Sequence, residues 1–214
     1  MRQFPILFLL YISLFTVNIS CNYYRHMKKT SAEEVCIQKF KPDFQKAEYK
    51  IAADVIGNHI SGLLLIKYMP DSSTRIVFTN EMGLSLFDFG FSGDTGFTVY
   101  HIVQQMNKAA LIKTLRKDFA LILFKNMDVT KSYDLTDSDE VYHAYPQTKA
   151  VNYYVTDKSC SRLVKMQRAS AKKPVMEAFF YDNLPGQSPD SIFIHHLNFN
   201  FSISLKKISP IASQ

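Results

Sequence analysis

From about residue 45 onward, most of the chain alternates hydrophobic and polar residues with a period of two, which is typical of β-strands. Short stretches rich in Gly, Asn, Asp or Ser divide this pattern into separate runs, as turns do. The predicted strands are 49–56, 60–69, 75–79, 84–91, 150–156, 162–166, 175–181, 191–195 and 199–206. Because tight turns join consecutive runs, we expect one antiparallel sheet of nine or ten strands.

Several of these runs are apolar on both faces. In the run 60–69, Leu63 and Leu65 alternate with Leu64 and Ile66, so neither side of the strand is polar. A sheet built from such strands must be covered on both sides by other parts of the chain.

Two helices are expected as cover. The segment 108–125 repeats hydrophobic residues at helical spacing, Leu115 and Phe119 among them, and carries basic residues on the opposite side. Asn107 is the expected N-cap of this helix. A capping-box pattern predicts a second, shorter helix at 32–40.

Two kinds of interior fit this pattern. The chain holds 17 Phe, 12 Tyr and no Trp, and many of these aromatic residues fall in the predicted strands. A sandwich core filled with side chains needs no ligand, whereas a curved half-barrel with an aromatic and aliphatic concave face offers a site for apolar ligands. In the second case the helix 108–125 acts as a plug, and the cavity and plug residues are Leu115, Phe119, Leu65, Phe87 and Phe89.

The N-terminus carries an uncharged apolar run at 4–17, behind the basic start of the chain. Its length of roughly 14 residues is short of the ~20 that a membrane-spanning helix needs, so the run predicts a signal peptide over 1–20. Cys21 follows it directly, and a polar tether is expected at 21–30.

Cys21 and its surroundings resemble a bacterial lipoprotein signal. In that family the cysteine thiol receives a diacylglycerol, the signal peptide is cut before the cysteine, and the new amino terminus is acylated with a chain such as palmitate. Asn18 departs from the Leu that the family prefers at this place. The resemblance implies a lipid-anchored protein of the cell envelope, in which Cys36 and Cys160 either pair or remain two buried free thiols.

The net charge of the chain says little about its binding partners. The formal charge of +6 comes from 25 basic and 19 acidic residues that are scattered along the chain, which does not indicate a nucleic-acid groove and favours a weak attraction to anionic membrane surfaces. The acidic stretch 128–140 is interpreted as a solvated surface loop, because its carboxylate spacing matches no calcium loop.

The sequence holds no P-loop, dinucleotide fingerprint or H-E-x-x-H motif. His195 and His196 are adjacent on a predicted strand, so they point to opposite faces and cannot bind one metal together. His59, His101 and His143 have no ligand partner at a suitable spacing. We therefore expect a binding protein with no cofactor and no metal, and not an enzyme.

Several stretches resemble the LolA/LolB group, the periplasmic carrier and outer-membrane receptor that pass lipoproteins between membranes. The run 59–67 is similar to the early s-G-x-L-x-h-K strand of that group, and 75–83 is similar to the strand and loop written R-L-x-h-x-N-P-L-G. Residues 179–185 and the alternating run 192–205 resemble the closing strands. The likeness covers about 45–207.

This resemblance implies a mainly β (α+β) fold: an open, strongly curved antiparallel sheet, or half-barrel, with a helical plug and an apolar cavity for acyl chains. The half-barrel domain is expected over 31–207, with a C-terminal tail at 208–214. Met82 occupies the place of the Leu in the N-P-L-G loop, where a protruding apolar side chain touches the membrane during lipid delivery. Glu81 stands in place of the proline.

The expected function is that of a monomeric lipoprotein, anchored in the outer membrane and facing the periplasm, that binds acyl chains or the lipid moieties of other lipoproteins. A LolA-like carrier is the expected partner. The alternative is an envelope lipoprotein that uses the sheet as a scaffold for a protein partner. A void of a few hundred cubic ångströms on the concave face favours the first function, and interdigitated side chains favour the second.

Overall fold

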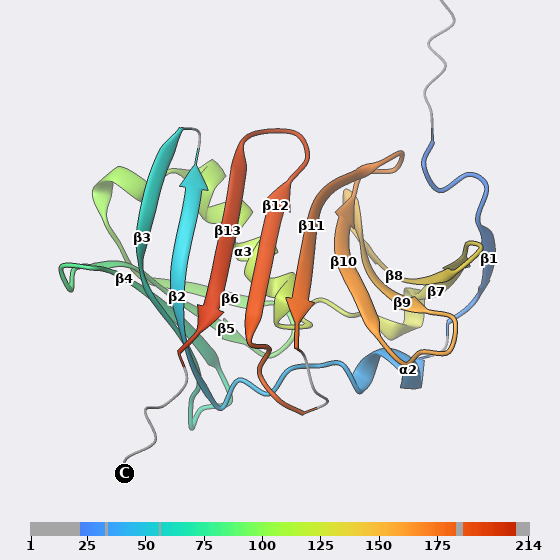
Figure 1. Ribbon diagram of the computed structural model, residues 1–214, viewed down its shortest axis with the longest axis horizontal. Helices are drawn as coiled ribbons and strands as arrows, with labels where there is room; N and C mark the ends of the chain where they lie inside the picture. The colour runs from blue at the N-terminus through green and yellow to red at the C-terminus, as the bar shows by residue number, and fades with distance from the viewer. Residues whose placement is uncertain (1–21, 33, 56, 183–185, 209–214) are drawn as a thin grey trace, which may run out of the picture.

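The computed structural model describes residues 22–32, 34–55, 57–182 and 186–208. The predicted signal peptide, Cys21 and the tail beyond residue 208 lie outside these residues. In the described part of the chain, thirteen strands form a single sheet in which neighbouring strands are antiparallel (Figure 1).

The strands are β1 (Lys28–Ser31), β2 (Lys46–Val55), β3 (Asn58–Tyr68), β4 (Thr74–Asn80), β5 (Ser85–Ser92), β6 (Gly96–Ile102), β7 (Tyr133–Thr136), β8 (Glu140–Gln147), β9 (Ala150–Asp157), β10 (Leu163–Ala169), β11 (Pro174–Tyr181), β12 (Ser191–His196) and β13 (Phe201–Lys207). The helical elements are α2 (Glu34–Gln38), α3 (Ala109–Ile122) and the short 3₁₀ turns η1 (Gln104–Met106) and η2 (Val129–Lys131).

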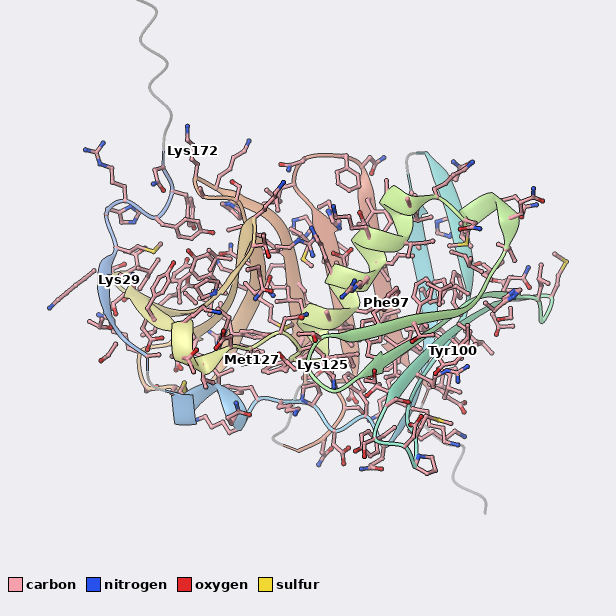
Figure 2. The ribbon with its side chains drawn as sticks, turned by 180° about the vertical axis from the view of Figure 1, so that it is seen from behind. Lys29, Phe97, Tyr100, Lys125, Met127 and Lys172 are labelled. Atoms are coloured by element: carbon pink, nitrogen blue, oxygen red, sulfur yellow. A yellow bond between two sulfur atoms is a disulfide. The ribbon has the colours of Figure 1, made fainter. Side chains whose placement is uncertain are left out.

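The sheet is open and strongly curved. Its order is β1-β7-β8-β9-β10-β11-β12-β13-β2-β3-β4-β5-β6, so β1 and β6 form the two edges. Strands β4 to β6 wrap around behind β2 and β13, and α3 lies inside this curve (Figure 1). Figure 2, from the other side, shows α3 in front of the central strands. The fold class expected from the sequence is therefore confirmed.

The alternation that predicted the strands is the alternation of burial. In β2, Tyr49 and Ile51 are buried while Glu48 and Lys50 are exposed. The last strand, β13, pairs with β2 and places Leu205 opposite Ile51, which joins the end of the chain to its first long strand. Each large apolar side chain buried in this way contributes about 1.5–3 kcal/mol.

A second hydrophobic cluster lies on the opposite side of the sheet, at β7 to β10. Tyr24 and Met27 are buried there, and the Tyr24 ring stacks on Tyr153 with 4.7 Å between ring centroids. The segment expected as a polar tether therefore covers the outer face, and the packed domain begins before residue 31. The polar sequence hid this role because only two of its side chains carry the packing.

The sequence pattern does not predict β1, β6, β7 or β8, and the stretch 128–140 was expected as a loop. That expectation is wrong: the stretch contains η2, β7 and the start of β8. Asp134 is almost fully buried because it faces His143 on the neighbouring strand, so an acidic residue was not a sign of exposure. The edge strand β6 was hidden by the exposure of most of its residues.

Both expected helices exist with shorter bounds. The N-cap of α3 is Lys108 and not Asn107, which instead ends η1. A disulfide joins Cys36 in α2 to Cys160 in the turn after β9, which decides between the two alternatives for these cysteines. No helix among the described residues is long and apolar enough to cross a membrane.

Burial makes a group of tyrosines hard to ionise. Desolvation is the first cause that raises the pKa of Tyr24, Tyr49, Tyr142, Tyr153 and Tyr154 above the ordinary value. Unfolded tyrosines lose their protons near pH 10, so above that pH the unfolded chain binds fewer protons than the folded chain. Stability should therefore be retained below about pH 10 and fall as the pH rises further.

Alkaline titration of phenolate absorbance checks this expectation. We expect part of the 12 tyrosines to ionise only as circular dichroism reports unfolding. Tyr49→Phe should remove one tyrosine from this late group. A single reversible transition of all tyrosines near pH 10, with the fold intact, would contradict the packing of both clusters.

Candidate functional site

Helix α3 presents one apolar side to the concave face of the sheet. Leu115 and Phe119 are buried, while Lys113, Arg116 and Lys117 lie on the exposed side, as the helical spacing predicted. The helix is buried more deeply toward its C-terminal end, where every residue from 118 to 122 is buried.

Four of the five predicted cavity and plug residues belong to one hydrophobic core. The rings of Phe119 and Phe87 lie 5.9 Å apart between centroids, and Phe87 stacks on Phe89 at 4.4 Å. Leu115 lines the same space under the helix. The prediction that these four side chains lie close together is therefore correct, although their role as a lipid cavity stays a prediction.

Leu65 does not join them. Its neighbours Leu64 and Ile66 are fully buried in the core, and Leu65, between them in β3, points to the opposite face and is half-buried. The prediction that Leu65 lines the cavity is wrong, because a strand that is apolar on both faces gives no sign of which face is the inner one.

With α3 seated, the interior is filled. Between the helix and the sheet remains a cavity of only about 20 Å³, lined by apolar side chains from α3, η1 and the strands β2, β3, β4, β5 and β13. An acyl chain does not fit in such a space. A ligand of that size would enter this space only after α3 moved away from it.

A buried ionic cluster fixes α3 to the sheet. Asp118, in the helix, accepts a hydrogen bond from Arg168 Nη2 of β10 at 2.8 Å and another from His196 Nε2 of β12 at 2.8 Å. Asp118 is completely buried. These three residues are called the Asp118 cluster below.

The Asp118 cluster is polar in a place that the sequence pattern marks as apolar. The His196 ring packs against Phe199 and Phe201, with centroids 4.6 and 4.9 Å away. Arg168 Nη1 is buried with no hydrogen-bond partner among the described residues. Burial, and after it the positive charge of Arg168, lowers the pKa of Lys117 on the helix. The cluster is thus held mainly by the two bonds to Asp118.

Further hydrogen bonds fix the C-terminal end of α3. Tyr154 donates its hydroxyl hydrogen to the carbonyl of Leu121 at 3.0 Å, which satisfies a helix-end acceptor. Asp94, in the turn between β5 and β6, accepts from the backbone amide of Asn126 at 2.6 Å. Phe124 leaves the helix in a left-handed conformation, with φ of 55°. The exit of the helix is therefore held firmly, while its first residues are exposed.

The histidines show what the sequence did and did not reveal. His195 and His196 do point to opposite faces, as expected for a strand, and His195 lies near Glu177. The partner of His196 is 78 residues away in the sequence, so local spacing had no means of finding it. The one available signal was Asp118 itself, an acidic residue within the buried end of an apolar helix. Among the described residues, groups of three or more metal-ligating side chains are absent.

No protein-family model and no curated protein matches the chain. Its fold resembles that of two solved structures. One is a LolA superfamily protein from Nitrosomonas europaea, with 11% identity and a TM-score of 0.45, matched over 84% of this chain and 92% of that one. The other is a domain from Vibrio parahaemolyticus described as an outer membrane lipoprotein-sorting protein, with 6% identity and a TM-score of 0.46, matched over 79% of this chain and 86% of that one.

At identities of 11% and 6%, these two likenesses concern the general fold alone. The open curved sheet and the enclosed helix follow from the strand pairing of this chain itself.

Replacing Asp118 by Asn tests the Asp118 cluster. The change leaves the Arg168 guanidinium buried without its counter-ion, which costs about 3–5 kcal/mol of unfolding free energy. The matched control is Asp54→Asn, because Asp54 binds His59 at the same 2.8 Å but on the surface. Exposed pairs of this kind contribute about 1 kcal/mol or less. Equal losses for both variants in urea denaturation would show that the Asp118 cluster does not fix the helix.

Proposed function

We propose that this chain is a lipid-anchored protein of the cell envelope that binds acyl chains between α3 and the sheet, with α3 as a movable plug. The observation that carries this proposal is the Asp118 cluster on the otherwise apolar inner side of α3. A helix that serves only as core gains little from it, because apolar replacements of buried ion pairs are often neutral or stabilising. A polar cluster does, however, give the helix one defined position on the sheet. When the bonds of the cluster break, the whole helix leaves that position together.

An acyl chain is a reasonable energetic substitute for the plug. Four large apolar side chains of α3 are buried, namely Leu115, Phe119, Leu121 and Ile122. At about 1.5–3 kcal/mol each, they contribute roughly 6–12 kcal/mol to the state in which α3 is packed on the sheet. At about 0.8 kcal/mol per buried methylene, a ligand with roughly 8–15 buried methylenes offsets that loss. Breaking the hydrogen bonds of the Asp118 cluster adds to the free energy that the ligand must supply. Long or multiple acyl chains, such as the lipid moiety of a lipoprotein, therefore fit better than short ones.

The alternative function is a scaffold for a protein partner, with a permanently filled interior. The small cavity under α3 favours it, because interdigitated side chains are what a plain core contains. The two functions differ in whether α3 leaves the sheet when acyl chains are supplied.

Phe119→Ala separates the two functions. In a plain core this truncation costs about 3–5 kcal/mol and opens no path for lipid. In a plug it removes a side chain that competes with the ligand, so capture of a fluorescent palmitate probe should increase several-fold while the loss of stability is smaller. Phe44→Ala is the control, because Phe44 is a buried core phenylalanine that does not line the cavity. A full stability loss with unchanged capture would identify α3 as ordinary core.

Met82 is the proposed membrane-contacting residue. It sits at the tip of the turn between β4 and β5, with 89% of its surface exposed. The side chain of Asn80 holds the turn by accepting from the amides of Met82 and Leu84, and Gly83 takes the positive φ of 84° that the turn requires. Nothing in the turn needs an apolar residue at position 82, and the exposed Leu84 follows it.

The first described residues and the turn between β4 and β5 lie toward opposite ends of the long axis of the molecule (Figure 1). Cys21 is the proposed acylation site, and the described chain starts one residue later, where the amide of Tyr23 bonds to the carbonyl of Lys172. While this segment stays packed, the β4–β5 turn is far from the start of the described chain. We therefore assign its contact to a second surface, either an acceptor membrane or a LolA-like carrier.

Met82→Glu tests this contact. Inserting a methionine side chain contributes about 1.5–3 kcal/mol, and a carboxylate removes that gain. We expect transfer of a fluorescent lipopeptide to separate acceptor liposomes to slow several-fold, with unfolding free energy changed by no more than about 0.5 kcal/mol. Val129→Glu puts the same charge on another exposed apolar residue and should leave transfer unchanged. Equal transfer rates for Met82→Glu and the parent protein would exclude Met82 from the contact.

A further inference from the structure

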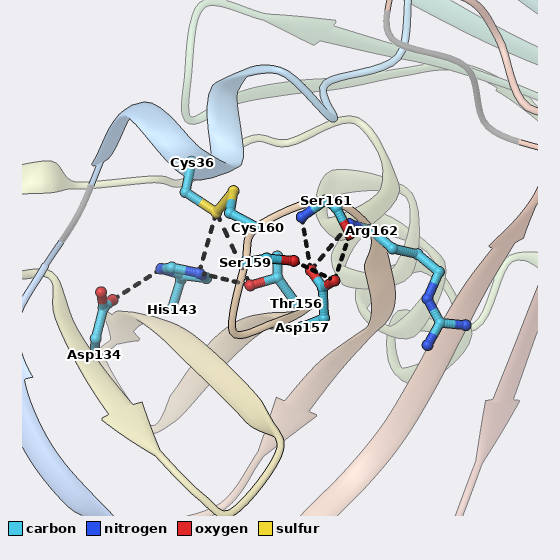
Figure 3. Close-up of a disulfide and its surroundings, with 9 residues drawn as sticks. All are labelled: Cys36, Asp134, His143, Thr156, Asp157, Ser159, Cys160, Ser161 and Arg162. Carbon is cyan, nitrogen blue, oxygen red and sulfur yellow. Dashed lines mark hydrogen bonds and ion pairs between the residues drawn. A yellow bond between two sulfur atoms is a disulfide. The ribbon is translucent and has the colours of Figure 1, made fainter.

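The disulfide between Cys36 and Cys160 has an unusual neighbour. His143 of β8 places Nε2 3.5 Å from Cys36 Sγ and 3.2 Å from Thr156 Oγ1 (Figure 3). The other ring nitrogen, Nδ1, lies 3.0 Å from Asp134 Oδ1 of β7. An ionised Asp134 accepts the hydrogen of Nδ1, which turns Nε2 toward the sulfur and the hydroxyl.

This arrangement is buried at its base and open at its mouth. Asp134 and His143 are 3% and 4% exposed, and Cys160 is less buried than Cys36. A pocket of about 280 Å³ is lined by both cysteines and by His143. A thiol reagent therefore has room to approach Cys160, while the sulfur of Cys36 faces the imidazole.

A disulfide that serves only as a staple has no use for this pair. Burying a carboxylate and an imidazole carries a desolvation cost, and apolar side chains at the two positions avoid it. The same pair has a clear use once the disulfide opens. An imidazole oriented by a carboxylate stabilises a neighbouring thiolate when it holds a proton, as in thiol enzymes.

We propose that Cys36–Cys160 is a redox-active disulfide that exchanges with a dithiol, and that Cys36 is its leaving group. A thiolate of the dithiol attacks Cys160 Sγ, the sulfur–sulfur bond breaks, and its electron pair goes to Cys36 Sγ. Cys36 then remains as a thiolate beside the protonated His143. A mixed disulfide now joins the dithiol to Cys160.

The second thiol of the dithiol completes the exchange. It attacks the reagent sulfur in the mixed disulfide, and the electron pair of that bond returns to Cys160. The reagent becomes a disulfide and loses two electrons, which the two cysteines have gained. The two protons of the dithiol end on Cys160 and on the His143–Cys36 pair. Exchange is faster and more favourable when the leaving thiolate is stabilised.

The other charged groups that line the pocket do not take the place of His143. Hydrogen bonds from Ser161 and then Ser159 hold the pKa of Asp157 well below its ordinary value and occupy its carboxylate (Figure 3). Lys158 is exposed at the mouth of the pocket. His143 is therefore the group placed to stabilise the Cys36 thiolate, with Asp134 as its positioning residue.

Reduction also has a structural consequence. The disulfide ties α2 to the turn after β9, and the segment around α2 contributes Ile37 and Phe40 to the main core. Opening it removes the covalent tie, so that α2 depends on non-covalent contacts, those of Ile37 and Phe40 among them. The redox state thus bears on how firmly the N-terminal part of the chain is docked.

The test uses the full chain with Cys21→Ser, so that Cys36 and Cys160 are the only thiols, since the sequence holds 3 Cys. The fraction of reduced protein is measured by alkylation gel shift in dithiothreitol redox buffers, and again with a protein that carries a reactive C-x-x-C dithiol. We expect reduction of the folded protein by both. Faster reaction with the protein dithiol at equal concentration assigns the exchange to a protein partner, and equal rates assign it to small thiols.

His143→Gln should shift the exchange equilibrium about tenfold toward the disulfide and slow reduction, and Asp134→Asn should act in the same direction. His59→Gln is the matched control, because His59 also binds a carboxylate but lies on the surface. The reduced parent protein supplies a readout that needs no folded variant: thiolate ultraviolet absorbance at neutral pH. A disulfide reduced only upon unfolding, or a reduced protein without thiolate absorbance, would overturn the proposal, as would a His143→Gln variant as easily reduced as the parent.

Discussion

An antiparallel sheet whose strands are apolar on both faces is stable only when each face is covered. The inner face of the sheet and the outer face of β7 to β10 meet this constraint, whereas the outer side of β3 stays open, with Leu63 51% exposed. Helix α3 covers the concave face of the central strands, and α2 adds Ile37 at one end of the same core. On the other side, the segment before β1 covers β7 to β10 through Tyr24 and Met27. The covers come from outside the continuous run of strands, so each needs its own fixation to the sheet.

The two covers near the core are fixed by different chemistry with a shared feature. The Asp118 cluster holds α3, and the disulfide holds α2, yet each site contains a histidine that is hydrogen-bonded to a buried carboxylate. Apolar packing alone tolerates sliding, because it is not directional. A buried hydrogen-bonded carboxylate has one position in which its bonds are made. Such contacts give each cover one defined docked state, and they release it only when the whole group of bonds is lost.

Much of the fold could be predicted because alternation and turns are local signals. The long strands and α3 were found in this way, and helical spacing correctly brought Leu115 and Phe119 to the inner face. Strands β1 and β7 escaped because their four residues each are too few for an alternation to be recognised, and β7 also looked like an acidic loop. Strand β6 escaped because most of its residues are exposed. Leu65 was misplaced for the opposite reason, since a strand with two apolar faces has no polar face to mark the outside.

The candidate sites were harder to predict because their residues meet only through the sheet. Asp118, Arg168 and His196 come from a helix and two strands that are far apart in the sequence, so spacing rules had nothing to act on. His143 was dismissed on the same local criterion, although its partner lies only nine residues away across the β7–β8 pair. The pair could be found by looking for a carboxylate opposite a histidine on the neighbouring strand of a predicted hairpin. Such a search requires that β7 is first recognised as a strand.

The cover on the outer face also decides how the proposed anchor orients the molecule. Tyr24 is stacked on Tyr153 and Tyr23 is bonded to the turn after β10, so the described chain is packed almost from its first residue. A lipid at Cys21 thus holds the β10–β11 end near its membrane and directs the β4–β5 turn away from it. Under the proposed function, an anchor at Cys21 would bind one surface while the β4–β5 turn offered Met82 to another. A carrier that only released its cargo into its own membrane would gain nothing from this polarity, whereas a protein that passes acyl chains between two surfaces requires it.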